Sequence, residues 1–88
     1  MLEIERTNQF KKDYKLAQRR GKRLERVESV IHSLASEEPL HPRHKPHKLT
    51  GDLEGFWECH IESDHLMIYR YAVGSVVLIR LGTHSDLF

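Results

Sequence analysis

The chain has 88 residues, which is enough for one small domain and too few for two. Its only cysteine is Cys59, so no intramolecular disulfide forms, which is typical of a protein of the reducing cytoplasm. The first residues are charged and every apolar run is short, so we expect neither a signal peptide nor a membrane span.

The net charge is only +1, but the charges are unevenly distributed. Residues 1–48 contain 12 Lys and Arg against 7 Asp and Glu, whereas residues 49–88 contain 2 against 6. Eight of the basic residues lie within 11–26. That stretch is either an ordinary solvated helix face or a surface that binds a polyanion such as RNA.

The N-terminal half predicts a short strand followed by two helices. Leu2 and Ile4 alternate with charged residues, which is typical of a strand. A helix capped by Thr7 or Asn8 follows. Its apolar residues recur at i, i+4 and i+7 and form one face, Phe10, Tyr14 and Ala17. The opposite face is basic, with Lys11, Lys12, Lys15 and Arg19.

The remaining elements follow from glycine, proline and a change of period. Gly21 predicts the end of the first helix, and a second helix is expected over roughly 23–35, paired with the first as an antiparallel hairpin. Residues 36–46 contain all three prolines and predict an irregular connection. The apolar period then changes to two, which predicts three strands, at 56–62, 65–71 and 76–81.

The expected fold is therefore one α+β domain, residues 1–88, in the order β-α-α-β-β-β. The helical hairpin packs on one face of a mainly antiparallel, twisted sheet. In such a meander His60 and Asp64 lie at the same edge as Arg80 and His84, because alternate turns of the meander lie at the same end. His47 enters the sheet from outside and is less constrained by topology.

This set of residues has the groups needed to cleave RNA through its own 2′-hydroxyl. Imidazoles exchange protons near neutrality, a carboxylate orients an imidazole or acts as a base, and a guanidinium binds phosphate oxygens. No metal or cofactor is needed, because the nucleophile belongs to the substrate. Each residue also has a structural interpretation: His60 as an exposed strand position, Asp64 as a turn residue, and Arg80 as a partner of Glu58 or Glu62.

The spacing of His41, His44 and His47 raises the alternative of a metal site. The H-x2-H-x2-H pattern lacks the i, i+4 spacing of a helical zinc motif, and prolines exclude a regular helix there. Cys59 is expected on the other face of its strand, with Trp57 and Ile61. We therefore expect no structural zinc.

Two segments carry a resemblance to a known family. "HKLTGDLEGFWECHIESDHLMIYRY", which begins at residue 47, and "LIRLGTHSDLF", which ends the chain, contain several motifs in the order found in the YafQ branch of the RelE-type toxins. The resemblance covers essentially the whole chain and implies a RelE-like fold and a ribosome-dependent endoribonuclease that cleaves mRNA in the decoding site. It places catalytic or substrate-contacting roles on His47, His60, Asp64, Arg80, His84 and Phe88.

The resemblance also implies partners. These are the ribosome with its mRNA and rRNA, and a cognate, DinJ-like antitoxin that wraps the toxin and itself binds operator DNA. We expect the basic helix face, Lys11, Lys12, Lys15 and Arg19, to bind ribosomal RNA. Two residues depart from the family pattern: Ser63 replaces a frequent proline, and His65 adds an imidazole that either contacts substrate or has no role.

Several alternatives remain open from the sequence. The chain is either a nuclease, a non-enzymatic ParE-like toxin, or an inactive protein that only binds an antitoxin. Within the nuclease interpretation, His84 is the expected general acid, and Asp64, His47 or His60 is the base. Of the three closely spaced histidines, His47 matches the family motif, whereas His41 and His44 are expected to be solvated or to face RNA.

Overall fold

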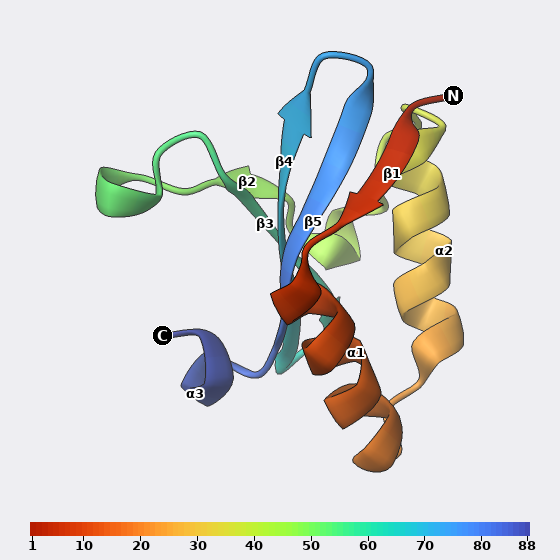
Figure 1. Ribbon diagram of the computed structural model, residues 1–88, viewed down its shortest axis with the longest axis vertical. Coiled ribbons are helices and arrows are strands. Elements are labelled where there is room, and N and C mark those ends of the chain that lie inside the picture. Colours follow the sequence, from red (N-terminus) through yellow and green to blue (C-terminus); the bar gives the residue numbers. More distant parts are fainter.

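The computed structural model describes all residues, 1–88, and contains five strands and three helices (Figure 1). The strands are β1 (Glu3–Arg6), β2 (His47–Lys48), β3 (Trp57–Glu62), β4 (His65–Ala72) and β5 (Ser75–Gly82). The helices are α1 (Asn8–Arg19), α2 (Leu24–Ala35) and α3 (His84–Leu87), and two 3-10 turns, η1 (Pro42–His44) and η2 (Gly51–Leu53), lie between α2 and β3. None of the helices has the length and apolar character needed to cross a bilayer.

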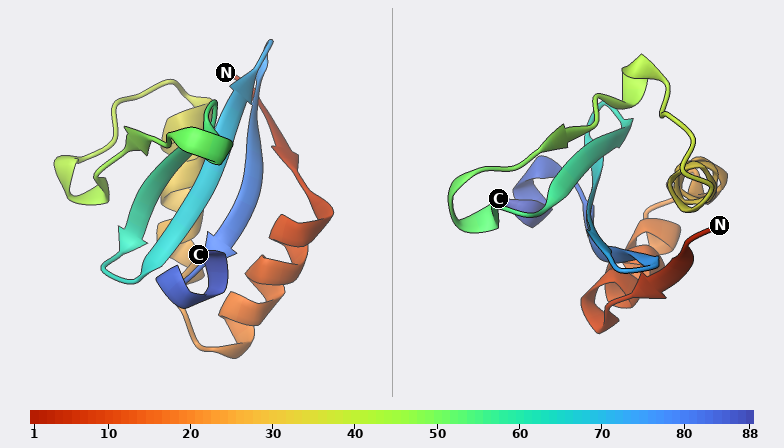
Figure 2. Two further views of the ribbon diagram at one scale, coloured as in Figure 1. Left: turned by 90° about the vertical axis from the view of Figure 1, so that its left-hand side faces the viewer. Right: turned by 90° about the horizontal axis from the view of Figure 1, so that it is seen from above.

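The strands form one mixed sheet in the order β1-β5-β4-β3-β2. β1 is parallel to β5, and the other pairs are antiparallel. The helices α1 and α2 run antiparallel on one side of the sheet, whereas α3 and the η2 loop lie on the other side (Figure 2). The predicted α+β fold with a helical hairpin on a mainly antiparallel sheet is confirmed.

The apolar core lies between the helical hairpin and the sheet. Phe10 of α1 and Ile31 of α2 are fully buried against Met67 and Tyr69 of β4 and Leu78 of β5. Burying each such side chain stabilises the fold by about 1.5–3 kcal/mol. The opposite, exposed side of α1 carries the basic residues, as the periodicity predicted.

Two caps fix the start and the end of α1. The Thr7 hydroxyl accepts a hydrogen bond from the Phe10 backbone N–H at 3.0 Å and donates one to the Ile79 carbonyl at 3.0 Å, which ties the helix start to β5. After α1, Gly21 adopts a φ of 74°, the left-handed conformation that ends a helix. Both predicted ends of this helix are confirmed.

The sequence prediction missed two short elements. β2 has only two residues, too few to show a period of two, and it pairs with β3 through His47 opposite Glu58 and Lys48 opposite Trp57. The Lys48 ammonium lies 5.5 Å from the centre of the Trp57 ring and adds a cation–π contact to this pairing. α3 has four residues and was not predicted; Thr83 and Asp86 form a capping box that holds it.

Candidate active site

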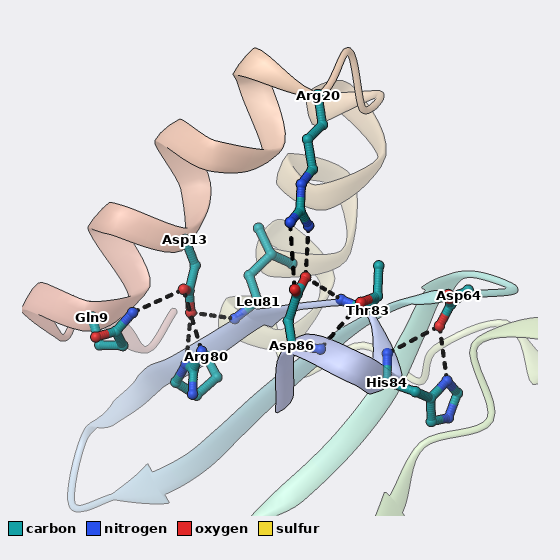
Figure 3. Close-up of polar contacts among 9 residues, drawn as sticks. All are labelled: Gln9, Asp13, Arg20, Asp64, Arg80, Leu81, Thr83, His84 and Asp86. Carbon is teal, nitrogen blue, oxygen red and sulfur yellow. Dashed lines mark hydrogen bonds and ion pairs between the residues drawn. The ribbon is translucent and has the colours of Figure 1, made fainter. Parts of the chain in front are cut away.

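Asp64 and His84 form a hydrogen-bonded pair where the β3–β4 turn meets α3 (Figure 3). One carboxylate oxygen of Asp64 accepts the His84 backbone N–H at 3.0 Å and its imidazole Nδ1–H at 2.9 Å. The pKa of the Asp64 carboxyl lies below its usual range, mainly because of the hydrogen bond from the His84 backbone N–H and secondly because of the bond from its imidazole. Because an ionised carboxylate only accepts, Nδ1 carries the proton and Nε2 is the nitrogen left to exchange one.

Gly82 allows α3 to fold close to the end of β5. A Cβ at this position would lie 2.8 Å from the Cβ of Asp86, a distance that real side chains do not tolerate. Asp86 is held in turn by Arg20, the C-cap residue after α1, at 2.7 Å and by the Thr83 backbone N–H at 3.0 Å. The Arg20 guanidinium is the main cause of a strongly lowered pKa of the Asp86 carboxyl. These contacts place His84 beside Asp64.

His60 lies across from His84 on the same edge of the sheet. The centres of the two rings are 6.1 Å apart, with an angle of 62° between their planes. The His60 side chain is 20% exposed, whereas that of His84 is 58% exposed. Two imidazoles at this separation can both reach oxygens bonded to one phosphorus, since a hydrogen bond spans about 2.6–3.2 Å.

Glu58 is a carboxylate of this site that the sequence interpretation considered only as a partner of Arg80. It is 5% exposed, and one of its oxygens lies 3.5 Å from Nε2 of His47 and 4.0 Å from Nε2 of His60. Its position two residues before His60 is the signal that places both side chains on one face of β3. Glu58 thus joins His47 to the site.

The backbone fixes how the His47 ring presents its nitrogens. Its Nδ1 lies 2.9 Å from the Lys45 carbonyl, which only accepts, so Nδ1 carries a proton. The other nitrogen, Nε2, faces Glu58 and donates to it only when the ring is doubly protonated. The ring therefore turns Nε2 toward the Glu58 carboxylate.

The structure does not bring the Arg80 guanidinium into contact with these groups. Its Nε donates to Asp13 of α1 at 2.8 Å and its Nη2 lies 3.5 Å from the same carboxylate, which also accepts the Leu81 backbone N–H at 3.0 Å (Figure 3). The alternative partners predicted for Arg80 were therefore wrong: Glu58 faces histidines and Glu62 pairs with Arg26 at 3.5 Å. Nη1 of Arg80 makes no hydrogen bond.

The remaining predicted binding residues lie on the surface. Phe88 follows α3, is 62% exposed, and does not fold back to cover the sheet. Its backbone N–H donates to the His84 carbonyl at 2.9 Å, which keeps it close to the Asp64–His84 pair. The basic residues of α1 are exposed and form no ion pair: Lys11, Lys12, Lys15 and Arg19.

The extra imidazole, His65, lies on the other side of the sheet. It is 2% exposed and lines a cavity of about 10 Å³ with Leu16 of α1 and Arg20, which follows α1. Its Nδ1 has no hydrogen-bond partner, and burial lowers its pKa. Contact between His65 and substrate is therefore excluded by its position.

His41, His44 and His47 bind three separate backbone groups. Nδ1 of His41 accepts from the Arg43 backbone N–H at 3.1 Å and caps η1, whereas Nδ1 of His44 donates to the His60 carbonyl at 2.6 Å. His47 binds the Lys45 carbonyl, as described above. No group of three or more His, Cys, Asp or Glu side chains in the chain is arranged to hold a metal ion.

The fold and this edge cluster define a class of protein. A helical hairpin on a five-stranded mixed sheet is the fold of the small YafQ- and RelE-like toxins. A profile of the bacterial toxin of type II toxin-antitoxin systems, YafQ, matches residues 2–88. The chain belongs to the YafQ family of type II toxins, and the resemblance found in the sequence is confirmed.

Known relatives are similar to this chain over nearly its whole length. The mRNA interferase toxin YafQ of Escherichia coli K12 is 34% identical over 98% of this chain and 95% of its own. The E. coli DinJ–YafQ complex contains a chain 34% identical, with a TM-score of 0.92 and coverage of 100% and 99%. A metal-bound toxin from Helicobacter pylori is 41% identical, with a TM-score of 0.94 and full coverage of both chains.

Proposed function

We propose that this chain is an mRNA interferase, a ribosome-dependent endoribonuclease that uses the 2′-hydroxyl of the mRNA as its nucleophile. The observation that carries the proposal is the Asp64–His84 pair, which lies opposite His60 at an exposed edge of the sheet; the centres of the His84 and His60 rings are 6.1 Å apart. A base and an acid on either side of one phosphate are what this reaction requires. The interferase activity of the E. coli relative supports the substrate class.

In this proposal the two sides of the site have different roles. His84, with Nδ1 held by Asp64, donates its Nε2 proton to the leaving 5′-oxygen. Asp64 is then a positioning residue that stabilises the protonated ring, not the base. His60, across from His84, takes the proton from the 2′-hydroxyl.

The bonds change in one displacement. As His60 takes the proton, the 2′-oxygen attacks phosphorus, the bond from phosphorus to the 5′-oxygen breaks, and His84 protonates that oxygen. The products are a 2′,3′-cyclic phosphate and a 5′-hydroxyl. The proposal gives His47, beside Glu58, and Arg80, through the Nη1 that Asp13 leaves free, the role of stabilising the negative charge that develops on the phosphate.

Phe88 and the basic face of α1 complete the proposed RNA contacts. The exposed ring of Phe88 stacks on a base next to the scissile bond, and the exposed cations of α1 bind ribosomal RNA phosphates. A DinJ-like antitoxin, as in the E. coli complex, holds the toxin inactive and carries it to operator DNA.

Single-turnover cleavage on programmed ribosomes tests these roles. General acid catalysis contributes about 10²–10⁴-fold, so His84→Ala should slow cleavage by that order, and His60→Ala should do the same. A substrate with sulfur in place of the 5′-oxygen needs no acid. It should restore His84→Ala and Asp64→Asn but not His60→Ala.

Three results would overturn parts of this assignment. If the sulfur substrate restores neither His84→Ala nor Asp64→Asn, His84 is not the general acid. Restoration of His84→Ala but not Asp64→Asn would make Asp64 the base. Absence of cleavage by the wild-type chain would favour the non-enzymatic alternatives.

A further inference from the structure

A second polar site lies between α2 and η1, beside the part of β3 that β2 does not cover. It is a cavity of about 200 Å³, the volume of roughly six or seven liquid waters. Its lining consists of Arg26, Ser29, Arg43, His44 and Ile61. Ile61 and His60 are consecutive in β3, so their side chains point to opposite faces, and the cavity is separate from the candidate active site.

The cavity lining is rich in hydrogen-bond donors and poor in acceptors. The Arg43 guanidinium takes part in no ion pair or hydrogen bond, although it has five N–H donors. The only charged partner of Arg26 is Glu62, whose carboxylate is 3.5 Å away, a distance typical of a weak surface pair. Two guanidiniums and a serine hydroxyl are groups that bind tetrahedral oxyanions.

His44 adds a ring whose orientation is fixed. Its Nδ1 donates to the His60 carbonyl at 2.6 Å, which covers an unpaired position at the edge of β3. Because Nδ1 is used, Nε2 is the nitrogen left for a ligand, and it becomes a third cationic donor when the ring is protonated. Arg43 is held next to this ring by η1, which His41 caps.

We propose that this cavity binds one phosphate group of an RNA backbone, at a position distinct from the scissile phosphate. The proposal rests on the proposed function, since the RNA is that of the programmed ribosome. An acidic peptide fits less well, because Ile61 is the only apolar residue in the lining and leaves no groove for apolar side chains. The site would add an anchor beyond the basic face of α1.

Inorganic phosphate is a direct probe that does not depend on ribosomes or on cleavage. A titration of the ¹⁵N-labelled chain, followed by amide NMR, should show saturable shifts at residues 43, 44 and 61. The double variant Arg26→Gln, Arg43→Gln should abolish them. Arg23→Gln removes the same charge from an exposed position at the start of α2, outside the cavity, and should leave them unchanged.

A second comparison separates phosphate binding from loss of the Arg26–Glu62 pair. Glu62→Gln breaks the pair but keeps the cation, so it should retain or tighten phosphate binding. If Glu62→Gln and Arg26→Gln weaken phosphate binding and lower the melting temperature equally, the pair is structural and the proposal fails. Shifts that do not saturate, or that survive in the double variant, would also overturn it.

Ribosome binding identifies the RNA. At low salt the double variant should bind about tenfold more weakly, and the log–log salt slope should fall by about 0.7–0.9 for one lost phosphate contact. The same loss on vacant ribosomes assigns the phosphate to rRNA, and a loss only with mRNA present assigns it to mRNA.

If the double variant binds ribosomes normally but binds the antitoxin more weakly, the cavity is a protein interface and the proposal is wrong. If the wild-type chain does not cleave mRNA, the proposed function fails, while the phosphate titration still decides whether the cavity binds anions.

Discussion

The Asp13–Arg80 ion pair joins α1 to β5 next to the candidate active site. Asp13→Ala tests how much this pair contributes to the stability of the protein. Asp13 is 7% exposed and accepts from Arg80, from the Leu81 backbone N–H and from the Gln9 amide. Its removal leaves the Leu81 N–H without a partner, which costs about 1–3 kcal/mol for a buried donor. It also leaves Arg80 without its counter-charge, but this side chain is 32% exposed, so water offsets part of the roughly 3–5 kcal/mol lost when a fully buried pair is broken.

The expected total is about 3–4 kcal/mol, a large part of the roughly 4–13 kcal/mol that a domain of this length has. A small domain loses about 4–8 °C of melting temperature per kcal/mol, so Asp13→Ala should melt roughly 12–30 °C lower. Asp13→Asn keeps an acceptor for the Leu81 N–H and removes only the charge, and its loss should be about 1–2 kcal/mol. Thermal unfolding followed by circular dichroism measures both. A melting temperature of Asp13→Ala within about 4 °C of the wild type would refute this account of the pair.

The same variants separate stability from catalysis at Arg80. Asp13→Asn leaves the guanidinium in place, so at a temperature where every variant is folded it should cleave mRNA as fast as the wild type. Arg80→Met removes the free Nη1 as well as the ion pair and should cleave more slowly in the chemical step. Equal rates for Arg80→Met and Asp13→Asn would restrict Arg80 to a structural role.

Three further outcomes are expected. Phe88→Ala should lower single-turnover cleavage by about 5–150-fold, the equivalent of about 1–3 kcal/mol of stacking, without changing the melting temperature of the protein; a large fall in melting temperature would show a packing role instead. Replacing Lys11, Lys12 and Lys15 by Gln should weaken ribosome binding and reduce its log–log salt slope by about 0.7–0.9 per lost phosphate contact, and an unchanged slope would show a merely solvated helix face. Burial lowers the pKa of His65, so below about pH 6.5 the unfolded chain binds a proton at this residue that the folded chain does not bind, and the stability of the protein should fall as the pH drops. His65→Phe should reduce this fall in stability between about pH 7.5 and 5. An unchanged pH dependence of stability would contradict the assignment.

Local periodicity predicted the elements that bury an apolar face. The i, i+4, i+7 spacing of Phe10, Tyr14 and Ala17 identified the side of α1 that faces the core, where Phe10 and Ala17 are buried and Tyr14 is partly buried. Periodicity could not predict β2, which is formed by pairing with β3 and not by its own two residues. α3 had a usable signal, the Thr83-x-x-Asp86 capping box, which is a helix start that apolar patterning does not reveal.

Strand order also predicted part of the site, but it did not predict which charged side chains form ion pairs. The meander correctly brought His60, Asp64 and His84 together, because residues at the same end of antiparallel neighbours must meet. It could not show that Arg80 turns toward Asp13, which lies 67 residues earlier in a different element. A buried aspartate within a basic helix has no local signal, since its neutralising partner comes from the packing of α1 on β5.

The spacing of the three loop histidines carries no information about function, because each ring is governed by a different backbone group. At His41 the Arg43 N–H occupies Nδ1, so the neutral ring keeps its proton on Nε2 and caps η1. At His44 and His47 carbonyl groups occupy Nδ1, so these rings present Nε2 outward. Only the Nε2 of His47 then lies near a buried carboxylate, that of Glu58, and only that ring joins the active-site edge. His44 instead links η1 to the backbone of His60 in β3, so one short segment supports the candidate active site on one face of the strand and the cavity on the other.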